Sequence, residues 1–351
     1  MKNRRRRMSV TIKDVAKRAN VSPSTVSRVL SDSSKISDKT KKKVRKTMDE
    51  LGYHINFNAR VLVQKSTKAI GIVMKHSASQ SMQNPFFPEI LRGISAFCHK
   101  KEYSISLTTG ESEQAIFEEV IKMVQGKRVD GLIVLYSKED DQVVPYLLEQ
   151  KIPFVVIGKP ASQSNQMMYV DNDNVQAAKE ATEFLIQLGH ERIGFIGDDP
   201  TFQVMQDRLN GYREGLLTSG LEVIDAYVKD FIYGTDRVKQ IIDELVALTI
   251  KPTAIVISAD VNAFAVMKEL RERGITVPEQ MSIISFNNTI LSQFSIPPMT
   301  AVDIQTYQLG YEASRCVIEL IHDTEMFKHS VIIPTIIKVR ESTCIPKIAE
   351  T

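Results

Sequence analysis

Four polar side chains lie close together near the amino end of the chain, and their chemistry suits contact with DNA bases. They are Ser24, Thr25, Ser27 and Arg28. Hydroxyl groups on short side chains can reach base edges in the major groove without a clash, and arginine can make a bidentate contact with guanine. These residues could therefore read a DNA sequence, provided that one face of a helix presents them together.

Two short helices are predicted to position these side chains. Thr11 is a suitable N-cap, with Asp14 completing a capping box, and apolar residues follow at helical spacing as far as Ala19. Ser22 and Pro23 begin a second helix, because serine caps helices well and proline is tolerated at the first helical position. Two helices joined by a tight turn, with the polar face on the second, predict a helix-turn-helix. The alternative is a surface helical hairpin with solvated polar residues.

A third helix is predicted from a serine cap at Ser37 to a glycine stop at Gly52. Val44, Met48 and Leu51 fall at helical spacing within it, so it can close a small core with the first two helices. Its outer face is densely basic, which suits contact with phosphates. The basic residues are Lys39, Lys41, Lys42, Lys43, Arg45 and Lys46.

Charge is distributed very unevenly along the chain. Residues 1–65 hold 18 lysines and arginines against 5 acidic residues, a net charge of +13. The remaining residues hold 27 against 37, a net charge of −10, and the whole-chain value of +3 hides this contrast. A basic head on an acidic body is typical of a nucleic-acid-binding head joined to another domain.

Length and composition favour an ordinary protein of the cytoplasm. The chain has 351 residues, 43% of them hydrophobic, and no apolar run approaches a membrane span. No apolar stretch follows the opening MKNRRRRM before Lys13, so a secretion signal is not expected; Met8 is an alternative start of translation. The three cysteines are odd in number and widely spaced, which is typical of reduced thiols.

Residues 54–67 form the expected linker, so we expect a head at 1–53 and a core at 68–346. Within the linker, residues 58–62 can form one capped turn of helix. So short a helix is marginal by itself and should become ordered only against a partner. Leu62 has two alternative roles, packing onto the next domain or contact with DNA.

From Ala69 onward, buried strands alternate with helical stretches. Strands are expected at 69–74, 104–109, 129–135, 153–158, 192–197, 253–258 and 281–286. This α/β alternation predicts doubly wound parallel sheets with helices on both faces, and about 280 residues favour two subdomains. A ligand is expected at the carboxyl ends of the strands, where several segments are polar or aromatic.

Enzyme motifs are missing from the sequence. It has no GxGxxG after a strand, no GxxxxGK[ST], no HExxH and no GxSxG. The six histidines are scattered, and His190 falls in a helix-to-strand turn that favours a structural role. We therefore expect no catalytic residues, no metal site and no cofactor.

Several motifs together resemble the LacI/GalR family of bacterial transcription regulators. They are TIKDVAKRANVSPSTVSRVL, KTKKKVRKTMDELGY, ARVL, LGHERIGFIG, RLNGYREGL and VPEQMSIISFNN. The resemblance covers about residues 11–343 and implies a helix-turn-helix head, a hinge, and a core like periplasmic sugar-binding proteins with three crossovers. It further implies a homodimer on a near-palindromic operator. NPFFPEILRGI and VIGKP are most similar to repressors of maltose or maltodextrin use.

The resemblance also implies site residues. Those for DNA are Thr11, Pro23, Ser24, Thr25, Ser27, Arg28, Tyr53, Asn56, Arg60 and Leu62, with Leu62 as the minor-groove wedge. Those for the effector are Phe86, Phe87, Lys159, Arg208, Asp260 and Asn287. Pro23 departs from members with a larger polar residue, and Asn287 with Asn288 replaces an aspartate pair. Gly158 and Lys159 stand where some members have an acidic residue. Arg208 has an alternative role as a structural ion pair with Asp207 or Glu214.

The sequence thus predicts a DNA-binding repressor of carbohydrate-use genes that answers a small sugar, with the maltose and maltodextrin class favoured. Three alternatives stay open: a regulator that answers another sugar, a sugar phosphate or a corepressor; a periplasmic binding protein; and a sugar-modifying enzyme. The missing signal peptide and the basic head argue against the second, and the missing motifs against the third.

Overall fold

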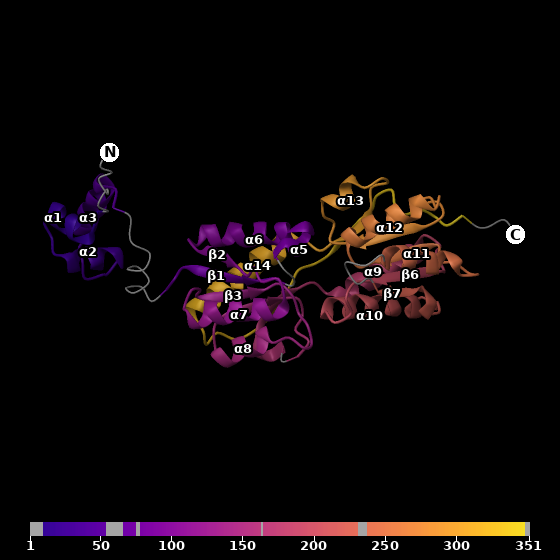
Figure 1. Cartoon of the computed structure of the whole chain (residues 1–351), viewed down its shortest axis with the longest axis horizontal. Helices are drawn as coiled ribbons and strands as arrows, with labels where there is room; N and C mark the ends of the chain where they lie inside the picture. Colours follow the sequence, from indigo (N-terminus) through magenta and orange to yellow (C-terminus); the bar gives the residue numbers. More distant parts are fainter. Residues whose placement is uncertain (1–9, 54–65, 75–77, 163, 231–236, 348–351) are drawn as a thin grey trace, which may run out of the picture. The chain divides into compact units, whose positions relative to one another are not determined.

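A computed structural model of the chain describes residues 10–53, 66–74, 78–162, 164–230 and 237–347 (Figure 1). The chain divides into two compact units, residues 1–68 and residues 69–351. Each unit is described by itself. Among the described residues, no helix is both long enough and apolar enough to cross a membrane.

The first unit contains the three predicted helices, α1 (Ile12–Ala19), α2 (Pro23–Leu30) and α3 (Asp38–Leu51). The capping box is present, since the Asp14 carboxylate accepts hydrogen bonds from the Thr11 amide at 2.8 Å and hydroxyl at 2.7 Å. The α3 helix ends at Gly52 in the left-handed conformation, as its sequence predicts. The small core consists of Val15, Ala16, Ala19, Val26, Val29 and Val44.

The second unit holds two six-stranded sheets. The strands of the first sheet all run parallel, in the order β11-β5-β4-β3-β1-β2. They are β1 (Ala69–Val73), β2 (Ser104–Leu107), β3 (Gly131–Val134), β4 (Phe154–Ile157), β5 (Met168–Asp171) and β11 (Ser330–Ile332). In β1, β3, β4 and β5, alternate residues enter the hydrophobic clusters on the two faces of the sheet. One cluster includes α6 (Phe86–Lys100) and α14 (Thr306–His322); the other includes α7 (Glu113–Gln125) and α8 (Val143–Gln150). The short α5 (Ala78–Gln83) precedes α6.

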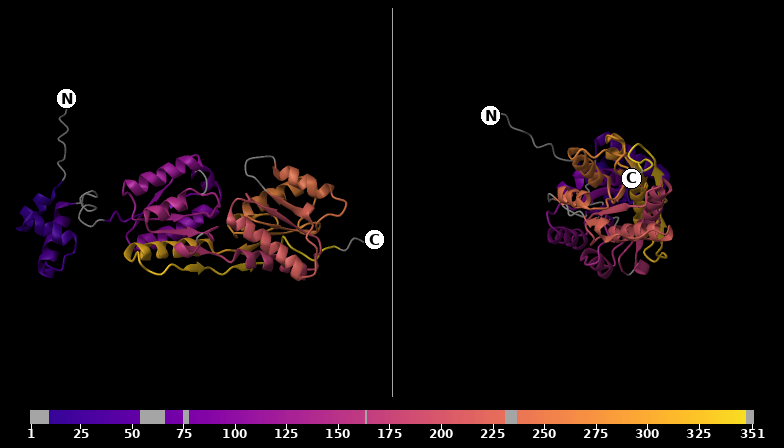
Figure 2. Two further views of the ribbon diagram at one scale, coloured as in Figure 1. Left: turned by 90° about the horizontal axis from the view of Figure 1, so that it is seen from below. Right: turned by 90° about the vertical axis from the view of Figure 1, so that its right-hand side faces the viewer.

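The second sheet has the order β12-β10-β9-β8-β6-β7, and only its edge strand β12 is antiparallel to its neighbour. Its strands are β6 (Ile193–Gly197), β7 (Val228–Asp230), β8 (Ala254–Ile257), β9 (Ser282–Phe286), β10 (Thr300–Asp303) and β12 (Ile336–Lys338). Helices lie on both sides of the strands (Figure 2). They are α9 (Asn174–Gln187), α10 (Gln203–Thr218), α11 (Arg237–Ala247), α12 (Asp260–Glu272) and α13 (Ile290–Phe294). The predicted fold class, helices followed by two parallel-sheet subdomains, is confirmed.

The chain passes between the two sheets three times, after β5, β10 and β11. Asn172, in the first crossover, joins all three. Its side-chain amide donates to the carbonyl of Ile304 at 3.1 Å and to that of Ile333 at 2.8 Å, and these residues belong to the other two crossovers. The predicted number of crossovers is therefore correct, and one buried asparagine connects them.

Candidate functional sites: a base-reading helix and a polar pocket

The α2 helix presents the residues predicted to read DNA bases. Pro23, Ser24 and Arg28 are exposed, while Thr25 and Ser27 are half-buried. The hydroxyl of the capping residue Ser22 lies 2.8 Å from both the Ser24 and the Thr25 hydroxyls, and it accepts from the Thr25 amide at 3.1 Å. These bonds cap the first turn of α2. The capped helix holds the predicted base-reading hydroxyl groups and Arg28 together.

Only some of the other predicted DNA contacts lie within the part of the chain that the structure describes. Thr11 is exposed at the start of α1, and Tyr53 packs partly buried against the core of the first unit. Asn56, Arg60 and Leu62 lie outside the described residues, so their roles stay predictions.

The basic face of α3 is smaller than its sequence predicts. The Lys41 ammonium lies 3.1 Å from the Asp32 carboxylate, and the Arg45 guanidinium lies 2.7 Å from it. The Lys41 side chain is only 13% exposed and also donates to the Asp32 carbonyl. Lys41 thus holds the turn before α3, which corrects its assignment to phosphate contact. Lys42 and Lys43 are exposed, as that assignment requires.

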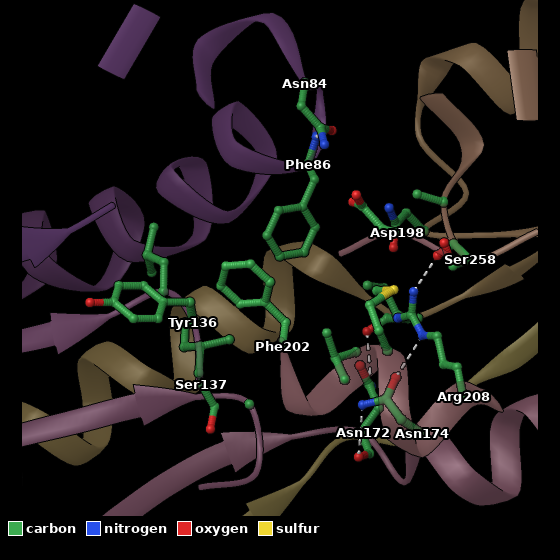
Figure 3. Close-up of a pocket in the computed structure, with 18 of the residues that line it drawn as sticks. Asn84, Phe86, Tyr136, Ser137, Asn172, Asn174, Asp198, Phe202, Arg208 and Ser258 are labelled. Carbon is green, nitrogen blue, oxygen red and sulfur yellow. Dashed lines mark hydrogen bonds between the residues drawn. The ribbon is translucent and has the colours of Figure 1, made fainter. Parts of the chain in front are cut away.

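A pocket of about 370 Å³ lies at the carboxyl ends of strands from both sheets. Its volume falls within the roughly 300–1,000 Å³ typical of small-molecule sites. Figure 3 shows aromatic rings of Phe86, Tyr136 and Phe202 on one side and polar groups around Arg208 on the other. Beside the aromatic side, the backbone amide of Gln203, at the start of α10, donates to the carbonyl of the lining residue Ser137 at 3.1 Å.

Arg208 is a buried polar group of the pocket with several contacts to neighbouring residues. It is 4% exposed, its Nε donates to Asn174 Oδ1 at 3.0 Å, and its Nη1 donates to the Ser258 carbonyl. Its guanidinium carbon lies 4.1 Å from the centre of the Phe286 ring. Burial lowers the pKa of Arg208 to about 10, while nearby carboxylates, Asp171 above all, oppose that change. The group therefore stays cationic at neutral pH. Among the described residues these two are its hydrogen bonds, which leaves three of its five N–H groups for a ligand.

The structural ion pair considered for Arg208 is not formed with Asp207 or Glu214 among the described residues. Asp207 instead accepts from the Gln203 side-chain amide at 2.8 Å. Asp171 is the acidic neighbour with the strongest effect on the charge of Arg208, and it too lines the pocket. Its carboxylate accepts from the Lys159 amide at 2.9 Å and from Asn174 at 3.0 Å. Burial raises the pKa of Asp171 to about 6.

Four of the six predicted effector residues line the pocket, namely Phe86, Phe87, Arg208 and Asn287. Lys159 and Asp260 do not, and both assignments are corrected. The side chain of Lys159 is exposed, because its backbone amide rather than its ammonium faces Asp171. Asp260 is fully buried, and its carboxylate accepts from the Thr289 amide at 2.6 Å and the Ser292 hydroxyl at 3.1 Å. Asp260 therefore ties α12 to the turn before α13. Asn288 is also turned elsewhere, toward Asp303 and Arg340.

Several pocket residues have no place among the predicted site residues. They include Asn84, Tyr136, Ser137, Asp171, Asn172, Asn174, Asp198, Asp199, Phe202, Ser258 and Asn262. Asp198 and Asp199 follow a predicted strand and Ser258 ends another, so the strand-end rule identifies their segments. Asp171 is the last residue of β5, and Asn172 and Asn174 come after it. Because β5 is not predicted, the strand-end rule does not identify this segment.

Comparison with known proteins matches both units. Residues 11–56 match bacterial regulatory proteins of the lacI family, and residues 182–343 match a periplasmic binding protein-like domain. The HTH-type transcriptional regulator MalR of Streptococcus pneumoniae is 51% identical over 209 residues, which cover 60% of this chain and 63% of that protein. The chain thus matches under two thirds of that relative. MalR of Staphylococcus xylosus is 35% identical over 338 residues, covering 95% of this chain and 98% of that protein.

Among solved structures, the lac repressor dimer bound to operator and the anti-inducer ONPF is similar over the full length. It superposes with a TM-score of 0.80 at 25% identity, covering 96% of this chain and all of that chain.

Proposed function

The chain belongs to the lacI family of bacterial regulatory proteins, and we propose that it represses carbohydrate-use genes under the control of a small sugar. The observation that carries this proposal is the presence in one chain of a helix that exposes Ser24 and Arg28 and a pocket lined by aromatic rings and polar groups. A regulator of this kind acts on DNA in the cytoplasm, and its family consists of regulators rather than enzymes.

The head supplies both kinds of DNA contact. Ser24 and Arg28 are exposed at the start of α2, where they can enter the major groove, and the exposed lysines of α3 supply charge for phosphates. In this proposal the hinge at residues 54–67 adds the minor-groove contact of Leu62 and a further DNA contact of Arg60. This division separates residues that select a sequence from residues that bind any DNA.

The pocket fits a sugar of the maltose or maltodextrin class. Aromatic rings such as Phe86 and Phe202 offer flat apolar faces for a sugar ring, while Arg208 and Asn287 offer hydrogen bonds to hydroxyl groups. Two relatives are named MalR, and a similar solved structure at 29% identity is described as a probable maltose operon transcriptional repressor malR, which favours this class over other sugars.

A homodimer is proposed to form through exposed apolar side chains on α12, on α13 and in the segment directly after α13. Phe264 is 48% exposed, Ile290 58%, Phe294 75% and Ile296 85%. Large apolar side chains grouped on a surface mark an interaction site, and two-fold pairing would bring two heads to the two halves of a palindromic operator.

The test is operator binding by the full chain with and without sugar, measured by fluorescence anisotropy. The panel contains maltose, maltotriose, cellobiose and glucose, and the DNA is the promoter region next to the gene. A change in operator affinity with maltose or maltotriose is expected. Sequence-specific binding that answers only another sugar would contradict the maltose class, and failure to bind any DNA would contradict the regulator itself.

A further inference from the structure

Two polar side chains of the pocket lining are buried without a hydrogen-bond partner in the described part of the chain. Ser258 is 0% exposed and Asn262 is 2% exposed, and both residues line the pocket. The unpaired atoms are the Ser258 hydroxyl oxygen and the Asn262 side-chain nitrogen. A buried polar group without a partner destabilises the folded state, so proteins keep few of them and each requires an explanation.

Other asparagines of the same lining have their side-chain nitrogens engaged within the protein. Asn174 donates to Asp171 Oδ1 at 3.0 Å, and its oxygen accepts from Arg208 Nε at 3.0 Å. Asn172 donates to two backbone carbonyls of the other crossovers. These amides serve the folded structure, whereas the Asn262 nitrogen has no such bond to a described residue.

The backbone of Ser258 holds its side chain in a fixed place. The Ser258 amide donates to the Ile196 carbonyl at 2.9 Å, and the Ser258 carbonyl accepts from Arg208 Nη1, a bond that Figure 3 shows. Both backbone groups are therefore engaged next to Arg208. The hydroxyl group can still turn about a single bond, so it can meet a ligand without movement of the backbone.

Neither capping nor helix propensity explains a buried asparagine at position 262. It lies in the first turn of α12, but Ala259 holds the N-cap position of that helix. Asparagine is also a weaker helix former than leucine or methionine. An apolar residue would avoid an unpaired amide here, so the polar group is better explained by a partner that binds in the pocket.

We infer that Ser258 and Asn262 bind hydroxyl groups of the effector. The inference rests on the proposed function, because it concerns the same pocket. A sugar hydroxyl both donates and accepts, so it can accept from the Asn262 amide and can form a hydrogen bond with the Ser258 hydroxyl in either direction. A ligand without hydroxyl groups at this point would leave both side chains unpaired, so the two residues also determine specificity.

Asn262→Leu and Ser258→Ala test this inference in the full chain. Leucine keeps the branched shape of asparagine without its polar atoms; Asn262→Ala replaces it should Asn262→Leu fail to fold. Calorimetric titration with maltose, maltotriose, cellobiose and glucose measures sugar affinity. For each sugar that the wild type binds, both variants should bind roughly tenfold more weakly, as expected for the loss of one hydrogen bond. Their urea midpoints without sugar should stay the same or rise, because the removed groups have no bond to lose.

Ser285→Ala and Tyr146→Phe are the matched controls. Their hydroxyl groups are also buried without a partner among the described residues, but neither residue lines the pocket. Both controls should keep or raise the urea midpoint and leave sugar affinity unchanged.

Unchanged sugar affinity in either pocket variant would overturn the inference and leave the proposed function intact. A urea midpoint that falls in the pocket variants but not in the controls would also overturn it, because it would indicate a structural role. A wild type that binds none of the four sugars would overturn the inference together with the sugar class. Operator binding would then decide separately whether the chain is a regulator.

Discussion

Arg208 is positioned before any ligand arrives. Its bonds to Asn174 and Ser258 and its stacking on Phe286 fix the guanidinium plane. A group fixed in this way loses little conformational freedom when it binds a ligand. A larger share of the free energy of each new hydrogen bond therefore contributes to affinity. The contribution of Arg208 to effector binding is therefore expected to be large.

Arg208→Ala should abolish the response to the effector. Hydrogen bonds to a charged group contribute about 1.5–3 kcal/mol each, so affinity should fall at least roughly tenfold to 100-fold. Operator binding should persist, because an effector acts only through its different affinities for two states of the core. The measurement is operator anisotropy with saturating sugar, with thermal melting to check folding. Arg213→Ala is the control, because Arg213 is on the same helix but outside the pocket lining. A full response to the sugar in Arg208→Ala would contradict the assignment of Arg208 to the effector site.

Asp171 should make stability depend on pH. Its pKa is about 6 in the folded chain against an ordinary 3.8, because burial disfavours the charged form. The folded state thus binds the proton more tightly, so this group favours folding at low pH and that contribution is lost as pH rises through 6. Between pH 5 and pH 7.5, the stability of the wild type relative to Asp171→Asn should fall by about 1–1.5 kcal/mol.

Urea denaturation of both proteins at the two pH values measures this difference. Other titrating groups cancel in the comparison, and Asp225→Asn, an exposed aspartate, should show a constant difference from the wild type. A difference between wild type and Asp171→Asn that does not change with pH would contradict the raised pKa.

Arg28 and Lys42 should affect DNA binding in different ways. Arg28→Ala should cost about 1–3 kcal/mol on operator and much less on random DNA, because a base contact is lost. Lys42→Ala should weaken operator and random DNA alike, because phosphates carry no sequence. Competition binding measures the ratio of operator affinity to random-DNA affinity for each variant. Equal losses of affinity on operator and random DNA for Arg28→Ala would contradict its assignment as a base reader.

At the scale of elements, two helix pairs pack so closely that only glycine fits between them. A Cβ atom at Gly93 on α6 would meet the Tyr307 carbonyl of α14, and one at Gly211 on α10 would meet the Val175 carbonyl of α9. The opposing atoms are backbone, so they cannot rotate away as a side chain would. Each pair covers one face of a sheet and packs against the strands whose ends form the pocket.

Gly93→Ala and Gly211→Ala should each destabilise the chain by roughly 2–3 kcal/mol, within the range for overpacked cores. Gly220→Ala is the control, because Gly220 has a left-handed backbone (φ 75°) but nothing within 4 Å of an added Cβ. Its cost should be about 1 kcal/mol, from backbone strain alone. Urea denaturation ranks the three variants, and a smaller loss for Gly93→Ala than for Gly220→Ala would contradict the close packing.

The elements that sequence predicts are those with strong local signals. The three head helices have caps, stops and periodic apolar residues, and six of the seven predicted strands are mainly apolar and become buried. The exception is β2, whose residues are exposed or half-buried although a buried strand is predicted there. The strands β5 and β10 each end in aspartate, so their apolar runs are short. Such segments become strands because neighbours supply their hydrogen bonds, and that information is not local.

The same limit applies to the pocket. The strand-end rule indicates the correct region, but it cannot say which way a side chain turns. Lys159 comes directly after Gly158, which has a positive φ of 110°. This backbone conformation points the Lys159 amide toward Asp171. The Asp260 carboxylate accepts hydrogen bonds from Thr289 and Ser292, which lie 29 and 32 residues later in the sequence. Both corrections arise from contacts between segments distant in sequence.

At the scale of the whole molecule, charge is divided between the DNA-binding part and the rest of the chain. Residues 1–65, the head with most of the hinge, carry +13 and the rest of the chain −10. The basic part can attract the DNA polyanion, while the acidic part keeps the body of the protein from binding it nonspecifically.

DNA binding should therefore depend steeply on salt. If the heads and hinges of a dimer neutralise about 6–10 phosphates, the logarithm of affinity should fall against the logarithm of salt concentration with a slope of roughly −5 to −9. Lys42→Ala should make the slope less steep by about 1 for each head that loses a phosphate contact. Arg28→Ala should change the slope less, provided that its guanidinium contacts a base. Anisotropy titrations of the full chain at several salt concentrations give these slopes. A slope near zero would mean that the charge of the head does not contact phosphates, because ion release is the source of the dependence.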